Sequence, residues 1–268
     1  MEKEALIQKY KDKPGASMAD NNPVIGAMLE TLDKSVGTLI KKLEELNLTD
    51  DTIVIFYGDN GGLEKRADQT PLRSGKASLY EGGIRVPMIA RWPGVIEPGT
   101  VCDDPTTTAD LLPTFCQATG AKLPDQPIDG MSMVPLFADS DADLDRDAIY
   151  FHYPHYHHSR PAGAIRAGDW KLIEFFDNAP LELYNLKDDI SETTNLAEKM
   201  PDKSKQLRQM LAKWRESVGA RMPTSNPKYD PDQAHQWWNR RTNEPIDIEA
   251  MARRYQSRTG KKPLPKKK

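Results

Sequence analysis

The spacing of hydrophobic positions predicts a helix followed by a strand near the start of the chain. In residues 22–47, apolar side chains recur every three or four positions, which is the period of a helix with one buried face. Asn21 or Asn22 can cap this helix, with Pro23 in its first turn. The continuous apolar run 53–57 follows, and such a run is typical of a strand covered on both faces in a parallel α/β sheet.

Two further elements are predicted before the pattern changes. Residues 86–91 predict a second short strand, and residues 106–119 predict a helix that ends at Gly120. We expect Thr107 or Thr108 to cap this helix. Its inward-facing side chains are expected to be Leu111, Leu112 and Phe115.

The hydrophobic period shortens in the second half of the chain. Residues 121–145 are rich in Pro, Asp and Gly, which indicates a boundary. Short strands are then predicted between turn residues, at 148–152, 162–166, 170–176 and 181–184. A helix is predicted at 201–218, so that 146–222 forms a small antiparallel sheet with one packed helix.

Composition narrows the class of protein. The 268 residues are 38% hydrophobic and 29% charged, which suits a soluble globular protein. The formal net charge of −3 gives no overall field for nucleic acid, although residues 251–268 carry eight Lys or Arg and no acid. We expect no nucleic-acid partner and no membrane, because no run approaches the roughly 20 apolar residues of a membrane span. The N-terminus also lacks the apolar core of a signal peptide.

The two cysteines give no redox or metal signature. Cys102 and Cys116 do not make a disulfide framework, and their spacing is not that of a zinc or redox motif. The cysteines therefore do not indicate an oxidising or a reducing compartment.

The first candidate for chemistry is Asp59-Asn60, at the end of the predicted strand 53–57. Ligands of open α/β sheets gather at the carboxyl ends of strands, and a carboxylate with an amide oxygen suits Ca²⁺ or Mg²⁺. The alternative is that Asp-Asn-Gly-Gly simply forms a turn, since all four residues favour turns.

The second candidate is Lys76, which follows Gly75 in a glycine-containing segment. An ammonium beside a cation site neutralises a tetrahedral oxyanion, and glycines let the backbone approach a ligand closely. An ordinary surface lysine is the alternative. The segment is not a phosphate-binding P-loop, because GxxxxGK[ST] is absent.

Residues 151–158 hold four of the five histidines among aromatic side chains. Such a segment can stack on a sugar or aryl ring, or it can be a strand end with surface histidines. A helical metal-binding pair is blocked by Pro154.

Taken together, these segments resemble the C-terminal part of a formylglycine-dependent sulfatase, arylsulfatase-like, within the alkaline phosphatase superfamily. The resemblance covers about residues 23–221 and is carried by ordered motifs at 53–62, 72–87, 108–115, 129–132, 164–166 and 183–186. Departures are small: Gly58 stands where Ser or Thr is usual, and Ser74 and Ala77 stand where glycines are common.

The resemblance implies site roles and a substrate class. Asp59 and Asn60 are then Ca²⁺ ligands, which favours the metal interpretation over the turn, and Lys76 contacts the sulfate ester near its leaving group. Substrate contacts are expected from Arg73, His152 and His155. The expected partner is a sulfated carbohydrate or an aryl sulfate, and family members are usually periplasmic or secreted.

The resemblance also implies a domain organisation. We expect 1–145 to be the C-terminal part of the catalytic α/β domain, a mixed-sheet sandwich. Residues 146–222 are expected to form a small α+β subdomain, and 223–268 a basic, flexible tail.

The family nucleophile is missing from the sequence. Sulfatases of this type oxidise a Cys or Ser in a C/S-x-P-S/A-R motif to formylglycine, but Cys102 is followed by Asp-Asp-Pro and Cys116 by Gln-Ala-Thr. The chain is therefore expected to begin inside the catalytic domain, to bind Ca²⁺ weakly, and to show little turnover alone. We also expect the truncated sheet to expose an apolar face and an unpaired edge, and to need a complementing N-terminal part.

Two alternatives to sulfate ester hydrolysis remain. One is phosphate or phosphonate ester hydrolysis within the same superfamily. The other is a non-catalytic remnant that binds glycans through residues 151–158.

Overall fold

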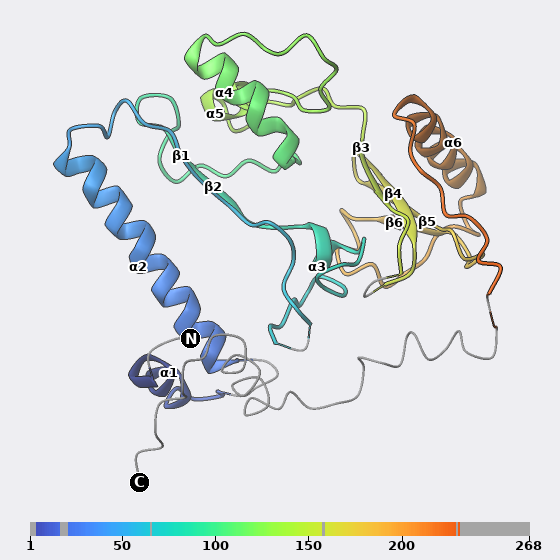
Figure 1. Ribbon diagram of the computed structural model, residues 1–268, viewed down its shortest axis with the longest axis horizontal. Coiled ribbons are helices and arrows are strands. Elements are labelled where there is room, and N and C mark those ends of the chain that lie inside the picture. The colour runs from blue at the N-terminus through green and yellow to red at the C-terminus, as the bar shows by residue number, and fades with distance from the viewer. Residues whose placement is uncertain (1–3, 17–20, 65, 157–158, 229, 231–268) are drawn as a thin grey trace. The chain divides into compact units, whose positions relative to one another are not determined.

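The computed structural model describes residues 4–16, 21–64, 66–156, 159–228 and 230 (Figure 1). One compact unit runs to Pro223, and a second is made of residues 224–268. Trp237, Trp238 and most of the predicted tail lie outside the described residues. Within the described ranges, no helix has the length and apolar character that crossing a membrane requires.

Two helices open the chain. The short helix α1 (Glu4–Lys11), which the sequence pattern did not predict, packs against α2 (Pro23–Glu45). Asn22 caps α2 by accepting a hydrogen bond from the Val24 amide at 3.0 Å, as predicted. The contact is close at Gly26, where an added Cβ would lie 2.5 Å from Cδ1 of Tyr10. A glycine at this position thus lets the aromatic ring lie on the helix backbone.

The apolar stripe of α2 is largely open to solvent. Its buried residues are Pro23 and Ala27, whereas Leu29 is 60% and Leu39 65% exposed. Met28 and Leu32 are also exposed. The period of this helix had predicted one buried face, whereas the structure leaves most of that face exposed.

Strands β1 (Val54–Tyr57) and β2 (Met88–Arg91) form an antiparallel pair, with Val54 opposite Arg91 and Tyr57 opposite Met88. The apolar run had predicted a strand covered on both faces in a parallel sheet. Instead, all four β1 residues are half-buried, because two strands alone cannot bury both of their faces. Both strands lie where they were predicted, but within the described chain their cover is incomplete.

Short helical segments follow. They are α3 (Glu81–Ile84), the 3₁₀ turn η1 (Thr108–Asp110), α4 (Leu111–Thr119) and α5 (Val134–Ala138). Thr107 caps η1 through a capping box with Asp110, and Gly120 ends α4 with a φ of 71°. Both helix boundaries agree with the prediction.

The inward face of α4 was predicted incorrectly. Leu112 and Phe115 are exposed, whereas Pro113, Thr114 and Cys116 are buried. The reason is a tertiary hydrogen bond: the Met133 amide donates to Oγ1 of Thr114 at 2.8 Å. This contact turns the Thr114 side of α4 toward the segment that leads into α5.

The second half of the unit is an antiparallel sheet with a packed helix, as predicted. Its strand order is β3 (Ile149–Tyr153), β4 (Ala162–Ala167), β5 (Trp170–Phe175) and β6 (Glu182–Asn185). Helix α6 (Pro201–Ser217) covers one face (Figure 1), where the core contains Ile165, Leu172, Leu183, Leu207 and Leu211. The opposite face contributes a second core of Ala162, Ala164, Ile173, Tyr184 and Leu186. This second core also contacts Leu79 and Tyr80, so the sheet is joined to the loop that carries Lys76.

Candidate active site

The turn after β1 and the loop that carries Lys76 are interlocked through their backbones. The Gly61 amide donates to the Gly83 carbonyl at 3.0 Å, and the Lys76 amide donates to the Gly62 carbonyl at 2.8 Å. A Cβ on Gly61 would lie 1.7 Å from the Gly82 carbonyl oxygen. Only a residue without a Cβ fits such an approach, so the glycines fix the turn and the loop against each other.

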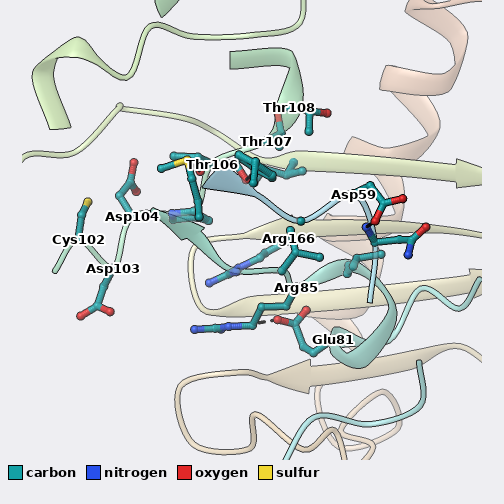
Figure 2. Close-up of a pocket in the computed structure, with 18 of the residues that line it drawn as sticks. Asp59, Glu81, Arg85, Cys102, Asp103, Asp104, Thr106, Thr107, Thr108 and Arg166 are labelled. Carbon is teal, nitrogen blue, oxygen red and sulfur yellow. Dashed lines mark hydrogen bonds and ion pairs between the residues drawn. The ribbon is translucent and has the colours of Figure 1, made fainter. Parts of the chain in front are cut away.

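Three predicted site residues line one cavity. Asp59, Asn60 and Lys76 all border an open cavity of about 940 Å³, which is also lined by residues of β2, β3 and β4. Figure 2 shows the Asp59 side of this cavity. The segment 16 residues away along the chain is thereby brought to the Asp59-Asn60 turn. Their roles as metal ligands and sulfate-binding lysine stay predictions.

Asp59 and Asn60 fit a hard cation in kind and supply part of its shell. Oδ1 of Asp59 accepts the Asn60 amide at 3.0 Å, and Nδ2 of Asn60 donates to the Gly61 carbonyl at 3.1 Å. These contacts leave one carboxylate oxygen of Asp59 and the amide oxygen of Asn60 available as ligands for a cation. Ca²⁺ takes about six to eight oxygens, and the described residues contain no cluster of three or more His, Cys, Asp or Glu placed to hold a metal. The remaining ligands would have to come from elsewhere.

The Lys76 loop adopts a tight conformation with left-handed residues on both sides of Lys76. Ser74 has a φ of 62° and Ala77 a φ of 70°, a region that costs a non-glycine residue about 1–2 kcal/mol. These are the two positions where glycine is common in the resembled family. The loop is held by Ser159, whose hydroxyl donates to the Ala77 carbonyl at 2.6 Å, and by the buried Ser78 hydroxyl, which donates to Gly75 at 2.9 Å.

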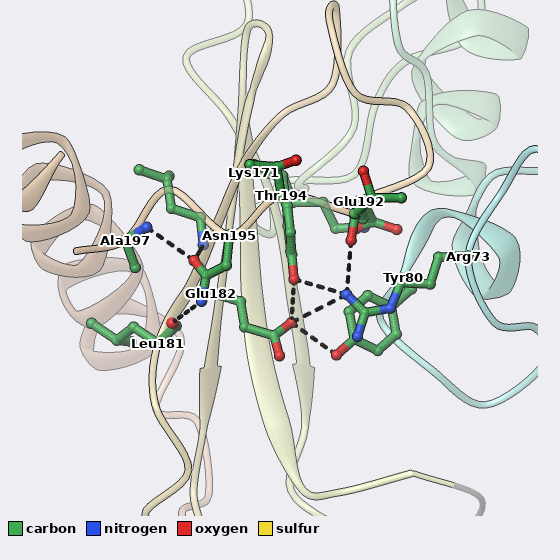
Figure 3. A network of polar contacts seen from close by, with 12 residues as sticks. Arg73, Tyr80, Lys171, Leu181, Glu182, Glu192, Thr194, Asn195 and Ala197 are labelled. Carbon is green, nitrogen blue, oxygen red and sulfur yellow. Dashed lines mark hydrogen bonds and ion pairs between the residues drawn. The ribbon is translucent and has the colours of Figure 1, made fainter. Parts of the chain in front are cut away.

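Arg73, a predicted substrate contact, does not line the cavity. Its Nη1 donates to the Tyr184 hydroxyl and to the Glu192 carbonyl, each at 2.8 Å (Figure 3). Its guanidinium lies 4.0 Å from the centre of the Tyr80 ring. Arg73 therefore joins the start of the Lys76 loop to the antiparallel sheet.

Glu182 completes this polar network. Its Oε2 accepts hydrogen bonds from the hydroxyls of Tyr80 and Tyr184, both at 2.8 Å. Burial, together with the neighbouring carboxylate, raises the pKa of both tyrosines well above the ordinary value, so both stay neutral donors.

A buried ion triad lies behind the cavity and reaches it through Glu81, which is one of the lining residues. Nζ of Lys171 is 2.9 Å from Oε1 of Glu81 and 2.8 Å from Oε1 of Glu192, and the Lys171 side chain is fully buried. The other oxygen of Glu192 accepts the Glu81 amide at 2.7 Å. Burial raises the pKa of the Glu192 carboxyl despite the nearby ammonium. The triad ties α3 to β5.

The sequence reasoning missed this triad. Lys171 occurs in a predicted strand, where a lysine normally faces solvent. Its partners are distant in sequence, so no local pattern marks them.

The two histidines predicted to contact substrate are not among the residues that line the cavity. Nε2 of His152 lies 2.8 Å from the Arg221 carbonyl, and its ring is 5.4 Å from that of Phe176. The His155 ring packs edge-on against Tyr153 at 5.7 Å. Among the described residues, the cavity is lined by Phe151 and Tyr153, not by these histidines. His157 and His158 lie outside the described residues.

Strand alternation explains this difference. Residues 149–153 form β3, and successive side chains of a strand point to opposite faces. Odd-numbered residues therefore face the cavity, and His152 faces away from it. The period of two in the sequence could have given this assignment.

Comparison with known proteins identifies the family. The family model described as N-sulphoglucosamine sulphohydrolase, C-terminal, matches residues 74–217, and the model described as sulfatase matches residues 7–121. This chain belongs to the sulfatase family, as its motifs indicated.

Individual relatives agree with that assignment. A sulfatase of Formosa agariphila is 36% identical over 216 residues, which is 73% of this chain and 39% of the relative. The crystal structure of Ps i-CgsB in complex with k-i-k-neocarrahexaose has a TM-score of 0.71 at 30% identity, over 80% of this chain and 46% of that one. BT4656, solved with its substrate D-glucosamine-2-N,6-O-disulfate, has a TM-score of 0.61 at 26% identity, over 78% of this chain and 44% of that one.

These comparisons confirm the fold class, that of the C-terminal part of a sulfatase. The chain spans less than half the length of each of these three relatives.

Proposed function

We propose that this chain supplies the sulfate-binding part of a sulfuric ester hydrolase. The observation that carries the proposal is the convergence of Asp59, Asn60 and Lys76 on one cavity. An ammonium and two oxygen donors for a hard cation suit a sulfate ester, whose negative charge the ammonium and a cation neutralise together. Membership of the sulfatase family supports the same reaction class.

The residues of this chain bind and orient, whereas the attacking group comes from elsewhere. Asp59 and Asn60 would hold part of a Ca²⁺ shell, and the ion would supply electrostatic stabilisation of the sulfuryl oxygens. Lys76 is an exposed residue that lines the cavity beside this turn. Neither cysteine has the motif of a formylglycine precursor. We therefore expect little turnover from these 268 residues alone, and the nucleophile to come from residues outside them.

A sulfated carbohydrate is the substrate class that best suits the cavity. Phe151 and Tyr153 line it, and aromatic rings stack well on sugars. The ligands named for Ps i-CgsB and BT4656 are both carbohydrates. An aryl sulfate is the second choice.

The proposed domain division is unchanged. It consists of a catalytic part at 1–145, a small subdomain at 146–222 and a tail at 223–268.

Replacing Lys76 by alanine is expected to weaken the binding of a monosulfated sugar by about tenfold to a hundredfold. A hydrogen bond to a charged group contributes roughly 1.5–3 kcal/mol, which corresponds to that range. Glucosamine 6-sulfate is the ligand, and isothermal titration calorimetry in millimolar Ca²⁺ is the measurement. Lys187→Ala, an exposed lysine after β6, is the matched control and is expected to bind like the parent chain.

Removal of Ca²⁺ and a change of ester separate the alternatives. A chelator is expected to weaken sulfate binding in the parent chain, and added Ca²⁺ to restore it. Binding that ignores both the chelator and Lys76→Ala would identify a glycan-binding remnant instead. Stronger binding of glucosamine 6-phosphate than of the 6-sulfate would favour the phosphate-ester alternative.

A further inference from the structure

The cavity extends beyond the Lys76 loop along one face of β3. Ile149, Phe151 and Tyr153 share this face and all line the cavity. Across the β3–β4 pair, Phe151 is opposite Ala164 and Tyr153 is opposite Ala162. Ala162 and Ala164 themselves are buried in the core that Phe151 also contacts, and we call the face of β3 that carries Ile149, Phe151 and Tyr153 the floor of the cavity.

The loop that carries Lys76 lies at the Tyr153 end of this floor. The Ser159 hydroxyl binds the Ala77 carbonyl at 2.6 Å, which fixes the Lys76 loop to the segment just before β4. The first residue of β4, Ala162, pairs with Tyr153. A sulfate held by Lys76 would therefore lie near the Tyr153 end of the strand.

The opposite end of the floor carries two arginines that line the cavity. Arg166 pairs with Ile149, four residues before Tyr153, and its buried Nε has no hydrogen-bond partner among the described residues. Nη1 of Arg85 lies 3.7 Å from Oε2 of Glu81, which is too long for a hydrogen bond. Figure 2 shows Arg85 and Arg166 extending to the same side of the view.

Nearby carboxylates leave these guanidiniums with donors to spare. Glu81 directs its other oxygen to Lys171, which is the cross-strand partner of Arg166. Asp104, within electrostatic range of Arg166, accepts the Leu144 amide with Oδ2 at 3.2 Å.

We propose that Arg85 and Arg166 form a second anion subsite in the cavity, which takes a sulfate or carboxylate on another sugar unit of the same ligand. A planar guanidinium binds either group through paired hydrogen bonds. The two anions would be separated by about 13 Å, since four strand residues at about 3.3 Å each lie between the Tyr153 and Ile149 ends. The ligand is thus an oligosaccharide with anionic groups on separate units, bound across Phe151 and Tyr153. This inference rests on the proposed sulfate site at Lys76.

The test compares two ligands and five variants of the full chain. The ligands are a galactose tetrasaccharide without uronic acid that carries one sulfate, and its counterpart with a second sulfate two units away, titrated calorimetrically at low salt with Ca²⁺. Arg166→Gln and Arg85→Gln are each expected to weaken binding of the disulfated ligand by about tenfold and to leave the monosulfated ligand unchanged. Arg166→Lys is expected to retain part of the affinity, because it keeps the charge without the paired donors. Arg221→Gln, an exposed arginine, is the control.

The outcomes separate the subsite from the proposed function. The subsite is overturned by equal losses for the two ligands, by no loss in either arginine variant, or by equal affinity of the parent chain for both ligands. A circular dichroism spectrum of each variant guards against misfolding. If Lys76→Ala binds both ligands normally while Arg166→Gln still weakens the disulfated one, the proposed function fails and the arginine subsite stands.

Discussion

Lys171→Met is expected to lower the free energy of unfolding by about 3–5 kcal/mol, the range found when one partner of a buried ion pair is removed. Methionine fills a similar volume, so little of the loss should come from a cavity. What remains are the carboxylates of Glu81 and Glu192, both buried and without the ammonium that lies between them. Desolvation of these groups is then uncompensated.

The measurement is urea denaturation followed by circular dichroism, with Lys213→Met as the control. Lys213 is an exposed residue of α6, and its substitution is expected to change stability by no more than about 0.5 kcal/mol. A loss below about 1 kcal/mol for Lys171→Met would show that the triad contributes little.

The stability deficit of Lys171→Met should depend on pH in a defined direction. Burial already raises the pKa of Glu192 above its ordinary value, and loss of the ammonium raises it further. A carboxyl whose folded pKa is raised binds its proton more tightly in the folded state. The deficit is therefore smallest below the unfolded pKa and grows as pH rises through the folded pKa. A smaller deficit at pH 4 than at pH 8 is expected, and the reverse order would contradict this account.

Gly61→Ala is expected to be the second most damaging change, with a loss of about 3 kcal/mol, the upper end of the usual cost of overpacking, because a clash with backbone cannot be relieved by a rotamer change. The added Cβ would lie 1.7 Å from the Gly82 carbonyl oxygen and 2.9 Å from Cα of Gly83. Relief requires the turn after β1 to separate from the Lys76 loop. Binding of a sulfated ligand should therefore fall together with stability.

A second glycine in the same chain is the matched control. Gly37 lies inside α2, where an added Cβ would meet nothing within 4 Å. Gly37→Ala is expected to raise stability by about 0.5–1 kcal/mol, because alanine favours the helix. Thermal melts of the two variants should thus shift in opposite directions. Equal shifts would mean that the interlocked backbones do not determine the outcome.

Local signals explain which elements could be predicted from the sequence. Asn22 and Pro23 mark the start of α2, and alternation with turn residues marks β3 to β6, because these patterns act over a few residues. That Asp59, Asn60 and Lys76 belong to one site was predicted from the motif resemblance. The structure places them on one cavity, and the close glycine contacts explain why the two segments lie together.

The missed features depend on contacts between distant segments. No local pattern around Lys171 indicates that Glu81 and Glu192 are its partners. Arg73 likewise joins its loop to the sheet through Tyr184, which is distant in sequence. The faces of α4 were misassigned for the same reason, since Thr114 is turned inward by Met133. The orientation of His152 follows a local rule, because side chains of β3 alternate between its two faces and Phe151 and Tyr153 line the cavity.

The contacts of Arg73 with Tyr184 and Glu192 limit how segments can be exchanged between sulfatases. A chimaera that takes its antiparallel sheet from another family member inherits a foreign residue opposite Arg73, where this chain places the Tyr184 hydroxyl and the Glu192 carbonyl. Transplants that move residues 73, 184 and 192 as one set should preserve the shape of the Lys76 loop, whereas swaps that divide the set should loosen it.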